Sequence, residues 1–302
     1  MEVRILEMPL DFGASRHGSD MGPSAIRLAG IRGRLEALGH SVSRRAATES
    51  VPAQEDAVPG DPRAKYLGPI TAACADLARE TESAAACGAF PLVLGGDHSV
   101  LLGSLAGVGA AARKAGKRLG VLYVDAHGDF NTPETSPSGN IHGQCLAASC
   151  GYGLQSLVDL HEPGRKVDPA RVCFVGTRDL DPGERGLMKG AGVTVFSMSD
   201  VDRRGFPAVL RDVTAFFRDR ADWVHVSFDM DVLDPMFAPG TGIPLPAGLT
   251  NREALLLMEE MAATGLVRSA DIVEVNPVLD IRNQTAVLAA ALAARLLGET
   301  IW

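Results

Sequence analysis

The sequence predicts an α/β protein in which helices cover both faces of a parallel sheet. Short apolar runs rich in β-branched residues alternate along the chain with longer segments of helical character. This alternation is typical of parallel sheets, whose strands are joined by crossover helices. With 302 residues and 46% apolar content, the chain can bury one large core. About eight strands and no internal linker can be counted, so residues 1–302 are expected to form a single domain.

In the first half of the chain, strands are expected at residues 3–6, 41–44, 91–94 and 119–124. Between them, one helix should open near Pro23, which suits a first helical turn, and close at Gly39. Further helices are expected at 70–87, which Gly88 ends, and at 99–116. Residues 51–62 are rich in Pro, Gly and acid, so they should form an exposed loop.

In the second half, strands are expected at 172–175, 193–196, 223–228 and 272–275, with a loop over 177–186. An amphipathic period predicts a helix over 208–217. Thr250 with Glu253 three residues later forms a capping box, which predicts the start of another helix. The Ala- and Leu-rich segment 284–297 should form the last helix.

Composition limits the classes of function. A formal charge of −8 offers no basic patch for nucleic acid or anionic lipid. No apolar run approaches the length of a membrane span, and the start MEVRILEMPLDFG lacks the features of a signal peptide. The five cysteines are odd in number and form no CxxC pair, which indicates free thiols in a reducing compartment. A cytoplasmic protein without nucleic-acid or membrane partners is expected.

The stretch DAHGDFN places three metal-type ligands after the apolar run 119–124. Ligands of open α/β folds bind at the carboxyl ends of the strands, where Asp125 should emerge. Residues two apart in extended backbone point to the same side, so Asp125, His127 and Asp129 should converge on one small volume.

Two further strand ends carry similar residues. Asp229, Asp231 and Asp234 follow the apolar run 223–228, and the first two share a face. His98 follows the run 91–94 after a pair of glycines that permits a tight turn. Asp234 is interpreted as a supporting or turn carboxylate, so two histidines and four carboxylates should meet at one site.

These six donors favour Mn²⁺ or Mg²⁺ over structural zinc, because they contain oxygen and imidazole nitrogen but no sulfur. Six ligands suit two metals, roughly 3.5–4 Å apart, that share bridging carboxylates and a hydroxide. Single aspartates at strand ends are usually helix caps, but that reading does not explain six donors in paired spacing. Nucleotide binding is disfavoured because neither GxGxxG nor GxxxxGK[ST] follows a strand. His225 is interpreted as a core histidine.

The motifs LGGDHS, DAHGDFN, SGNIHG and SFDMDVLDP resemble those of the ureohydrolase family, most closely the bacterial arginases. The resemblance extends from DFGASRHGSDMGPSAIR near the start to DIVEVNP near the end. It implies a three-layer arginase-like α/β fold around an eight-stranded parallel sheet. It also implies hydrolysis of L-arginine to L-ornithine and urea by a metal-bridging hydroxide in a binuclear Mn²⁺ site, in a homo-oligomer, hexamer or trimer.

The resemblance assigns roles to individual residues. One Mn²⁺ would be held by His98, Asp125, Asp129 and Asp229, and the other by Asp125, His127, Asp229 and Asp231. Asp129 would also pass a proton to the departing amine, with His142 as a proton shuttle and Glu274 beneath the guanidinium.

The amino-acid end of the substrate would be recognised by a second set of residues. Neutral donors from one loop would meet the α-carboxylate: Asn131, Ser136, Ser138 and Asn140. Asp181 would hold the α-ammonium, with Glu184 beside it. One departure from the family pattern is TGIP, where Ile243 replaces a threonine and removes a hydroxyl near the guanidinium pocket.

Three other classes of protein could carry similar motifs. Agmatinase, or another ureohydrolase of guanidino compounds, would have no use for a carboxylate-binding SPSGN loop. A non-catalytic amino-acid-binding regulator would require a damaged metal set, and no ligand is missing. A zinc deacetylase would not need both His98 and the carboxylate-rich pair of sites.

Overall fold

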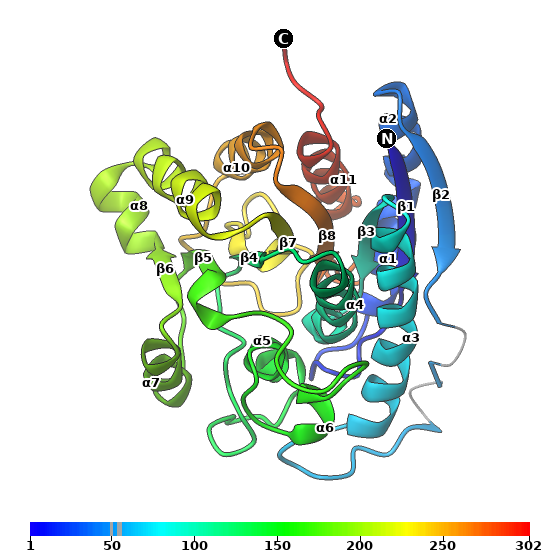
Figure 1. Ribbon diagram of the computed structural model, residues 1–302, viewed down its shortest axis with the longest axis vertical. Helices are drawn as coiled ribbons and strands as arrows, with labels where there is room; N and C mark the ends of the chain where they lie inside the picture. Colours follow the sequence, from blue (N-terminus) through cyan, green and yellow to red (C-terminus); the bar gives the residue numbers. More distant parts are fainter. Residues whose placement is uncertain (49–50, 53–55) are drawn as a thin grey trace.

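The computed structural model describes residues 1–48, 51–52 and 56–302 and has three layers (Figure 1). The middle layer is an eight-stranded sheet in the order β2-β1-β3-β8-β7-β4-β5-β6, and every pairing is parallel. The expected fold class and strand number are therefore confirmed. The strands are β1 Glu2–Met8, β2 Ser41–Ala46, β3 Phe90–Gly95, β4 Leu119–Val124, β5 Val172–Thr177, β6 Thr194–Ser197, β7 Trp223–Asp229 and β8 Val267–Val273.

Helices cover the sheet on both sides (Figure 1). One face carries α2, α9, α10 and α11, and the other carries α3, α4, α5 and α7. Each face buries its own apolar cluster, so the strands between them are apolar almost throughout. The helices are α1 Gly22–Leu28, α2 Ile31–Ala37, α3 Leu67–Ala86, α4 Leu101–Lys114, α5 Cys145–Ser149, α6 Gln155–Val158, α7 Pro182–Ala191, α8 Met198–Arg204, α9 Phe206–Arg220, α10 Asn251–Ala263 and α11 Gln284–Leu296.

Helices α3 and α4 pack closely against each other, and glycines on α4 make this approach possible. A Cβ added at Gly107 would lie 2.3 Å from the carbonyl oxygen of Ala78. A Cβ at Gly103 would lie 2.6 Å from the carbonyl oxygen of Cys74. Side chains at these positions would separate the two helices, so the glycines are required by packing.

Several predicted elements need correction. The single helix expected over 23–39 is two helices, because Gly30 adopts φ +83 and breaks the ladder between α1 and α2. The loop expected over 177–186 is wrong, since Pro182 begins α7 as a first-turn proline. Helix α8 was not predicted, and β8 begins at Val267, five residues before the apolar run that indicated it.

Other predicted elements are confirmed. Thr250 caps α10 in a capping box with Glu253, and α11 spans nearly all of 284–297. The expected loop 51–62 includes residues 53–55, which lie outside the described residues; the described remainder contains no α-helix or β-strand. The five cysteines are unpaired. No helix in the described part of the chain is both long and apolar enough to cross a bilayer.

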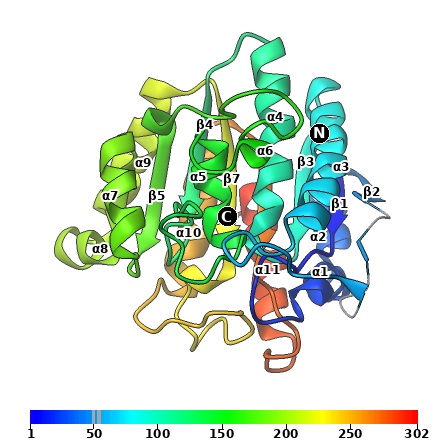
Figure 2. The same cartoon turned by 90° about the horizontal axis from the view of Figure 1, so that it is seen from below.

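The sheet order determines where chemistry can occur. Strands β3, β8, β7 and β4 are consecutive neighbours, and their parallel direction brings their carboxyl ends to one edge. Figure 2 shows the yellow loop after β7 and the orange-red loop after β8 at the same end of the sheet. Residues that lie far apart in the sequence therefore meet there.

Candidate metal centre and active site

His98 lies at the centre of a buried group of carboxylates. It follows β3 at the start of a short 3₁₀ turn, and its side chain is fully buried. Its Nδ1 is 3.1 Å from Asp125 Oδ2, 3.1 Å from Asp229 Oδ2 and 3.3 Å from Asp129 Oδ2. The ends of β3, β4 and β7 thus place four predicted metal ligands around one point.

His127 and Asp231 form a second group beside the first. His127 Nδ1 lies 3.1 Å from Asp231 Oδ2 and 3.5 Å from Asp125 Oδ1. The structure therefore contains two ligand triads, His98–Asp125–Asp229 and Asp125–His127–Asp231, with the ligand atoms of each triad within 4.8 Å of one another. Because Asp125 belongs to both, the arrangement suits two cations that share a carboxylate.

Two buried carboxylate oxygens in this cluster, Asp125 Oδ2 and Asp231 Oδ1, accept no hydrogen bond from the described residues. Asp125 Oδ2 still forms an ion pair with His98 Nδ1 at 3.1 Å, whereas no such contact is seen at Asp231 Oδ1 within the described chain. A buried anionic oxygen without a donor is costly, and a bound cation would remove that cost. The donor set of carboxylate oxygens and imidazoles also matches the ligands of Mn²⁺. The residues present therefore fit a binuclear metal site.

The histidines and carboxylates of this cluster shift one another's pKa values. Burial lowers the pKa of His98 and of His127, but the neighbouring carboxylates outweigh burial and raise both pKa values well above the usual range. Burial, reinforced by the charges of Asp231 and Asp125, raises the pKa of Asp229. Metal binding would displace protons from these groups, so metal affinity depends on pH.

A buried network of hydrogen bonds holds the His98 ring at its Nε2 atom. Ser227 Oγ lies 2.8 Å from His98 Nε2 and donates its own hydrogen to Asp271 Oδ1 at 2.5 Å. Asp271 Oδ2 accepts from Ser104 Oγ at 2.5 Å and lies 2.9 Å from His225 Nε2. Because the Ser227 hydrogen is used by Asp271, its oxygen accepts from Nε2–H, which leaves Nδ1 for a metal.

Sequence reasoning missed most of this network. His225 is buried, as expected of a core histidine, but it is also a member of the network. The available signal was polar residues at alternate positions of apolar strands, His225 and Ser227 in β7 and Ser269 and Asp271 in β8. Polar groups that face a core at that spacing indicate a network, because each must find a partner.

A cavity of about 130 Å³ opens above the metal ligands and brings most of the predicted substrate residues together. Asn140 instead lines an adjoining cavity of about 410 Å³, where its amide donates to Ser15 Oγ at 2.9 Å. Ile243, 46% exposed, lines both cavities. The predicted residues that line the smaller cavity are His127, Asp129, Asn131, Ser136, Ser138, His142, Asp181, Glu184, Asp229, Asp231 and Glu274.

The polar loop at the cavity mouth is held by its own hydrogen bonds. Ser136 Oγ accepts from the Gly139 amide, and Ser138 Oγ accepts from the Asn140 amide. Both hydroxyl hydrogens therefore remain able to donate to a ligand. The amide of Asn131 donates to Asp181 Oδ2 at 2.9 Å, which ties this loop to the start of α7.

Glu184 supports the cavity wall. Its Oε1 accepts from the Asp181 amide at 2.9 Å and its Oε2 accepts from the Phe130 amide at 3.1 Å. Burial raises the pKa of Glu184 to about 7, despite these hydrogen bonds. Both oxygens face backbone donors, so the contact geometry is that of a residue that orients Asp181.

Glu274 links the cavity to the metal ligands. Its Oε1 accepts from the backbone amide of His98 at 2.9 Å and lies 3.1 Å from His142 Nδ1. Burial lowers the pKa of His142, but Glu274 outweighs it and the pKa of His142 rises to about 9. Glu274 and Asp129 both adopt left-handed backbone, with φ +63 and φ +47. Strain of this kind persists where the surroundings impose it, and it concentrates at functional sites.

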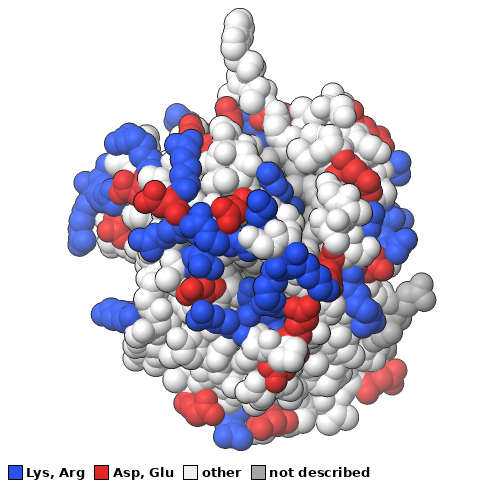
Figure 3. Space-filling model, in the orientation of Figure 1, with Lys and Arg blue, Asp and Glu red and all other residues white. Residues whose placement is uncertain are grey.

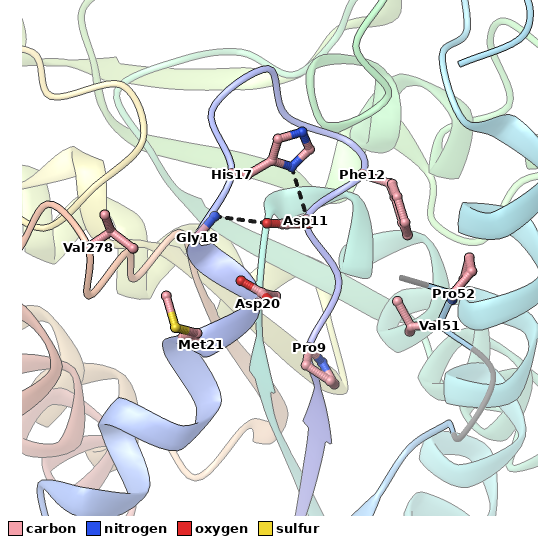
Figure 4. A pocket seen from close by; sticks show the side chains of 10 residues that line it. All are labelled: Pro9, Asp11, Phe12, His17, Gly18, Asp20, Met21, Val51, Pro52 and Val278. Atoms are coloured by element: carbon pink, nitrogen blue, oxygen red, sulfur yellow. Dashed lines mark hydrogen bonds and ion pairs between the residues drawn. The ribbon is translucent and has the colours of Figure 1, made fainter. Parts of the chain in front are cut away.

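A larger cavity of about 470 Å³ lies beside the N-terminal loop (Figure 4). Asp11 accepts from the Gly18 amide at 2.9 Å, and its Oδ1 lies 3.4 Å from His17 Nδ1 (Figure 4). The same loop carries Gly13, whose carbonyl accepts from the amide of His142 at 3.2 Å. These bonds brace the loop that supports His142.

Comparison with known proteins gives similarity over the whole chain. The Arginase family model matches residues 1–298. The arginase of Bacillus caldovelox is 44% identical over 299 residues, which cover 99% of this chain and 99% of that relative. The crystal structure of arginase from Bacillus cereus has a TM-score of 0.93 at 44% identity, with full coverage of both chains. Entamoeba histolytica arginase in complex with L-ornithine has a TM-score of 0.89 at 33% identity, over 99% of each chain.

Proposed function

Because the chain belongs to the arginase family, we propose that it hydrolyses L-arginine to L-ornithine and urea. The observation that carries this proposal is the pair of ligand triads sharing Asp125 at the base of a small polar cavity. A relative crystallised with L-ornithine, the amino-acid product of this reaction, supports the same reading.

The proposed cofactor is Mn²⁺, two ions per chain. The residues that would hold it are His98, Asp125, His127, Asp129, Asp229 and Asp231. Bound there, Mn²⁺ would lower the pKa of a coordinated water enough to make it a nucleophile near neutral pH.

Glu274 is proposed to orient the guanidinium. Its Oε1 is already held by the His98 amide, which fixes the carboxylate and leaves Oε2 for the planar guanidinium. His142, protonated at neutral pH by virtue of its raised pKa and only 12% exposed, would carry protons between the cavity and solvent. Asp129 lines the cavity and would accept a proton from the attacking water and deliver it to the departing amine.

The amino-acid end of the substrate is proposed to face the opposite wall. Hydroxyls of Ser136 and Ser138, with the amide of Asn131, would meet the α-carboxylate as neutral donors. Asp181 would meet the α-ammonium, with Asn131 and Glu184 holding it in position. Asn140 lines the adjoining cavity, so its proposed contribution is to shape the loop through Ser15.

We also propose a domain organisation, a location and an assembly for this chain. Residues 1–302 are taken as one catalytic domain, because β8 near the end of the chain pairs with β3 from its first third. A cytoplasmic location is proposed because the five cysteines are unpaired. Assembly into a homo-oligomer, hexamer or trimer, is proposed from the family resemblance, and sedimentation analysis would test it.

A urea-release assay with added Mn²⁺ tests the function. L-arginine, agmatine and guanidinobutyrate should be compared at equal concentration, with metal content measured in the same samples. Preference for L-arginine with two Mn²⁺ per chain is expected. Faster cleavage of agmatine would assign the chain to another ureohydrolase activity, and full activity with a single zinc would contradict the two-manganese site.

A further inference from the structure

Tyr123 is a fully buried residue of β4 that no metal motif contains. It lies two positions before Asp125, so both side chains point to the same side of the strand. Its hydroxyl donates to Asp129 Oδ2 at 2.7 Å and lies 3.1 Å from His98 Nδ1. Its ring stacks on the His98 ring, with centroids 4.7 Å apart and an angle of 8° between the planes. Tyr123 therefore touches two of the proposed metal ligands.

Asp129 depends on this contact for its orientation. The Tyr123 hydroxyl makes the shortest bond that the Asp129 carboxylate receives within the described chain. Among the described residues, the other possible donors near Oδ2 are His98 Nδ1 at 3.3 Å and the Cys145 thiol at 3.9 Å. Among the described residues no hydrogen bond reaches Oδ1, and Asp129 lines the cavity. One oxygen is thus held inside the protein and the other is left to the cavity.

The backbone alone does not fix this carboxylate. Asp129 has φ +47, a conformation that non-glycine residues rarely adopt, so contacts with the surrounding protein must hold this residue in place. A phenol is suited to that task because its O–H stays protonated at neutral pH and can only donate to an ionised carboxylate. A phenylalanine at 123 would fill nearly the same space but leave a buried carboxylate oxygen without its donor.

We infer that Tyr123 is a positioning residue for Asp129. The O–H of Tyr123 holds Asp129 Oδ2 against His98 and so directs Asp129 Oδ1 into the cavity. The consequence for proton transfer rests on the proposed function. The consequence for metal binding does not, because it concerns only the orientation of a ligand.

The test is Tyr123→Phe, with Tyr152→Phe as the matched control. Tyr152 packs its ring near Phe130 at a centroid distance of 5.8 Å, and within the described chain its hydroxyl forms no hydrogen bond with a proposed metal ligand. In Mn²⁺-loaded protein, Tyr123→Phe should lower kcat for L-arginine by about 10- to 100-fold, because one hydrogen bond to a charged group is lost. Its KM should stay within about twofold of the KM of the unmodified protein. Tyr152→Phe should change neither constant by more than about twofold.

A Mn²⁺ titration followed by electron paramagnetic resonance gives a readout independent of activity. Tyr123→Phe should weaken one of the two Mn²⁺ sites by about tenfold or more and leave the other nearly unchanged, since Asp129 belongs to only one proposed ligand set. Two Mn²⁺ affinities and a kcat within about twofold of the unmodified protein would overturn the inference. If the unmodified protein cleaves no guanidino compound yet the Mn²⁺ shift is seen, the proposed function fails and the positioning role stands.

A second variant keeps the inference testable if Tyr123→Phe unfolds. Tyr123→Trp retains an aromatic ring over His98 and offers an indole N–H as donor. It should hold both Mn²⁺ ions with affinities within about tenfold of the unmodified protein. A folded Tyr123→Trp protein that has lost one Mn²⁺ site altogether would show that the donor is not what positions Asp129.

Discussion

Removal of the Ser227 hydroxyl should weaken metal binding without touching any proposed ligand. Ser227 accepts from His98 Nε2 at 2.8 Å and donates to Asp271 at 2.5 Å, so Ser227→Ala frees the imidazole to rotate. Loss of such a supporting partner typically costs 10- to 100-fold in metal affinity, or about 1.4–2.8 kcal/mol.

Ser104→Ala is the matched control because its hydroxyl binds the same carboxylate from the other side. Ser104 Oγ donates to Asp271 Oδ2 at 2.5 Å, and in the described part of the chain it forms no hydrogen bond with His98. Either substitution takes a donor from a buried carboxylate, which costs about 1–3 kcal/mol of folding free energy. Ser104→Ala should fall at the lower end of that range, because His225 still reaches Oδ2 at 2.9 Å.

The assay measures the Mn²⁺ affinity of metal-stripped protein by calorimetric titration, with the unfolding midpoint of the same samples. Ser227→Ala should lose Mn²⁺ affinity, whereas Ser104→Ala should lower the midpoint by a few degrees and bind Mn²⁺ like the unmodified protein. Equal loss of affinity in both variants would refute the reasoning, because the network would then act through general stability.

Three further predictions concern the proposed chemistry. His142→Ala should lower kcat by about 10²-fold or more with unchanged metal content, and a loss of manganese would instead make His142 a ligand. The kcat/KM for L-arginine should exceed that for agmatine by about a hundredfold or more, because agmatine loses two hydrogen bonds to the α-carboxylate, worth roughly 1.5–3 kcal/mol each. Equal values of kcat/KM would contradict the assignment of Ser136 and Ser138 to the α-carboxylate. Apparent Mn²⁺ affinity should rise with pH, because the raised pKa values of His98 and His127 in metal-free protein mean that Mn²⁺ must displace their protons. Each displaced proton corresponds to about tenfold in affinity per pH unit, and titrations at pH 6.5 and 8.5 that agree would show that no proton is released.

The candidate metal ligands could be predicted from the sequence because they obey a local rule. Asp125, Asp229 and His98 each follow an apolar run, and parallel strands end at one edge. The rule needs no knowledge of strand order. The rule could not reveal Tyr123 or Ser227, because both lie inside apolar runs that simply predict buried strands. A single buried hydroxyl needs a hydrogen-bond partner, but it does not change that prediction.

The missed helices have a similar cause. Helix α7 contains Gly183, Gly186 and Gly190, which depress helix propensity, so the segment reads as a loop. Its stability comes from its first turn, where Glu184 accepts from the Asp181 amide, and from burial of Met188. Tertiary contacts of this kind outweigh the low helix propensity of the segment, but its amino-acid composition does not reveal them.

The order of the strands has a consequence for how the site is assembled during synthesis. Strand β8 is the last to be made, yet it lies between β3 and β7 and is the only strand that joins the β2-β1-β3 half of the sheet to the β7-β4-β5-β6 half. All six proposed ligands have left the ribosome once Asp231 has emerged, but His98 belongs to one half and Asp125 and Asp229 to the other. A nascent chain that has not yet added Val267–Val273 therefore carries every donor, but the triad that contains His98 is still divided between the two halves. Binding of the proposed metal pair should therefore follow synthesis of β8, and a chain terminated at residue 266 should bind no metal pair.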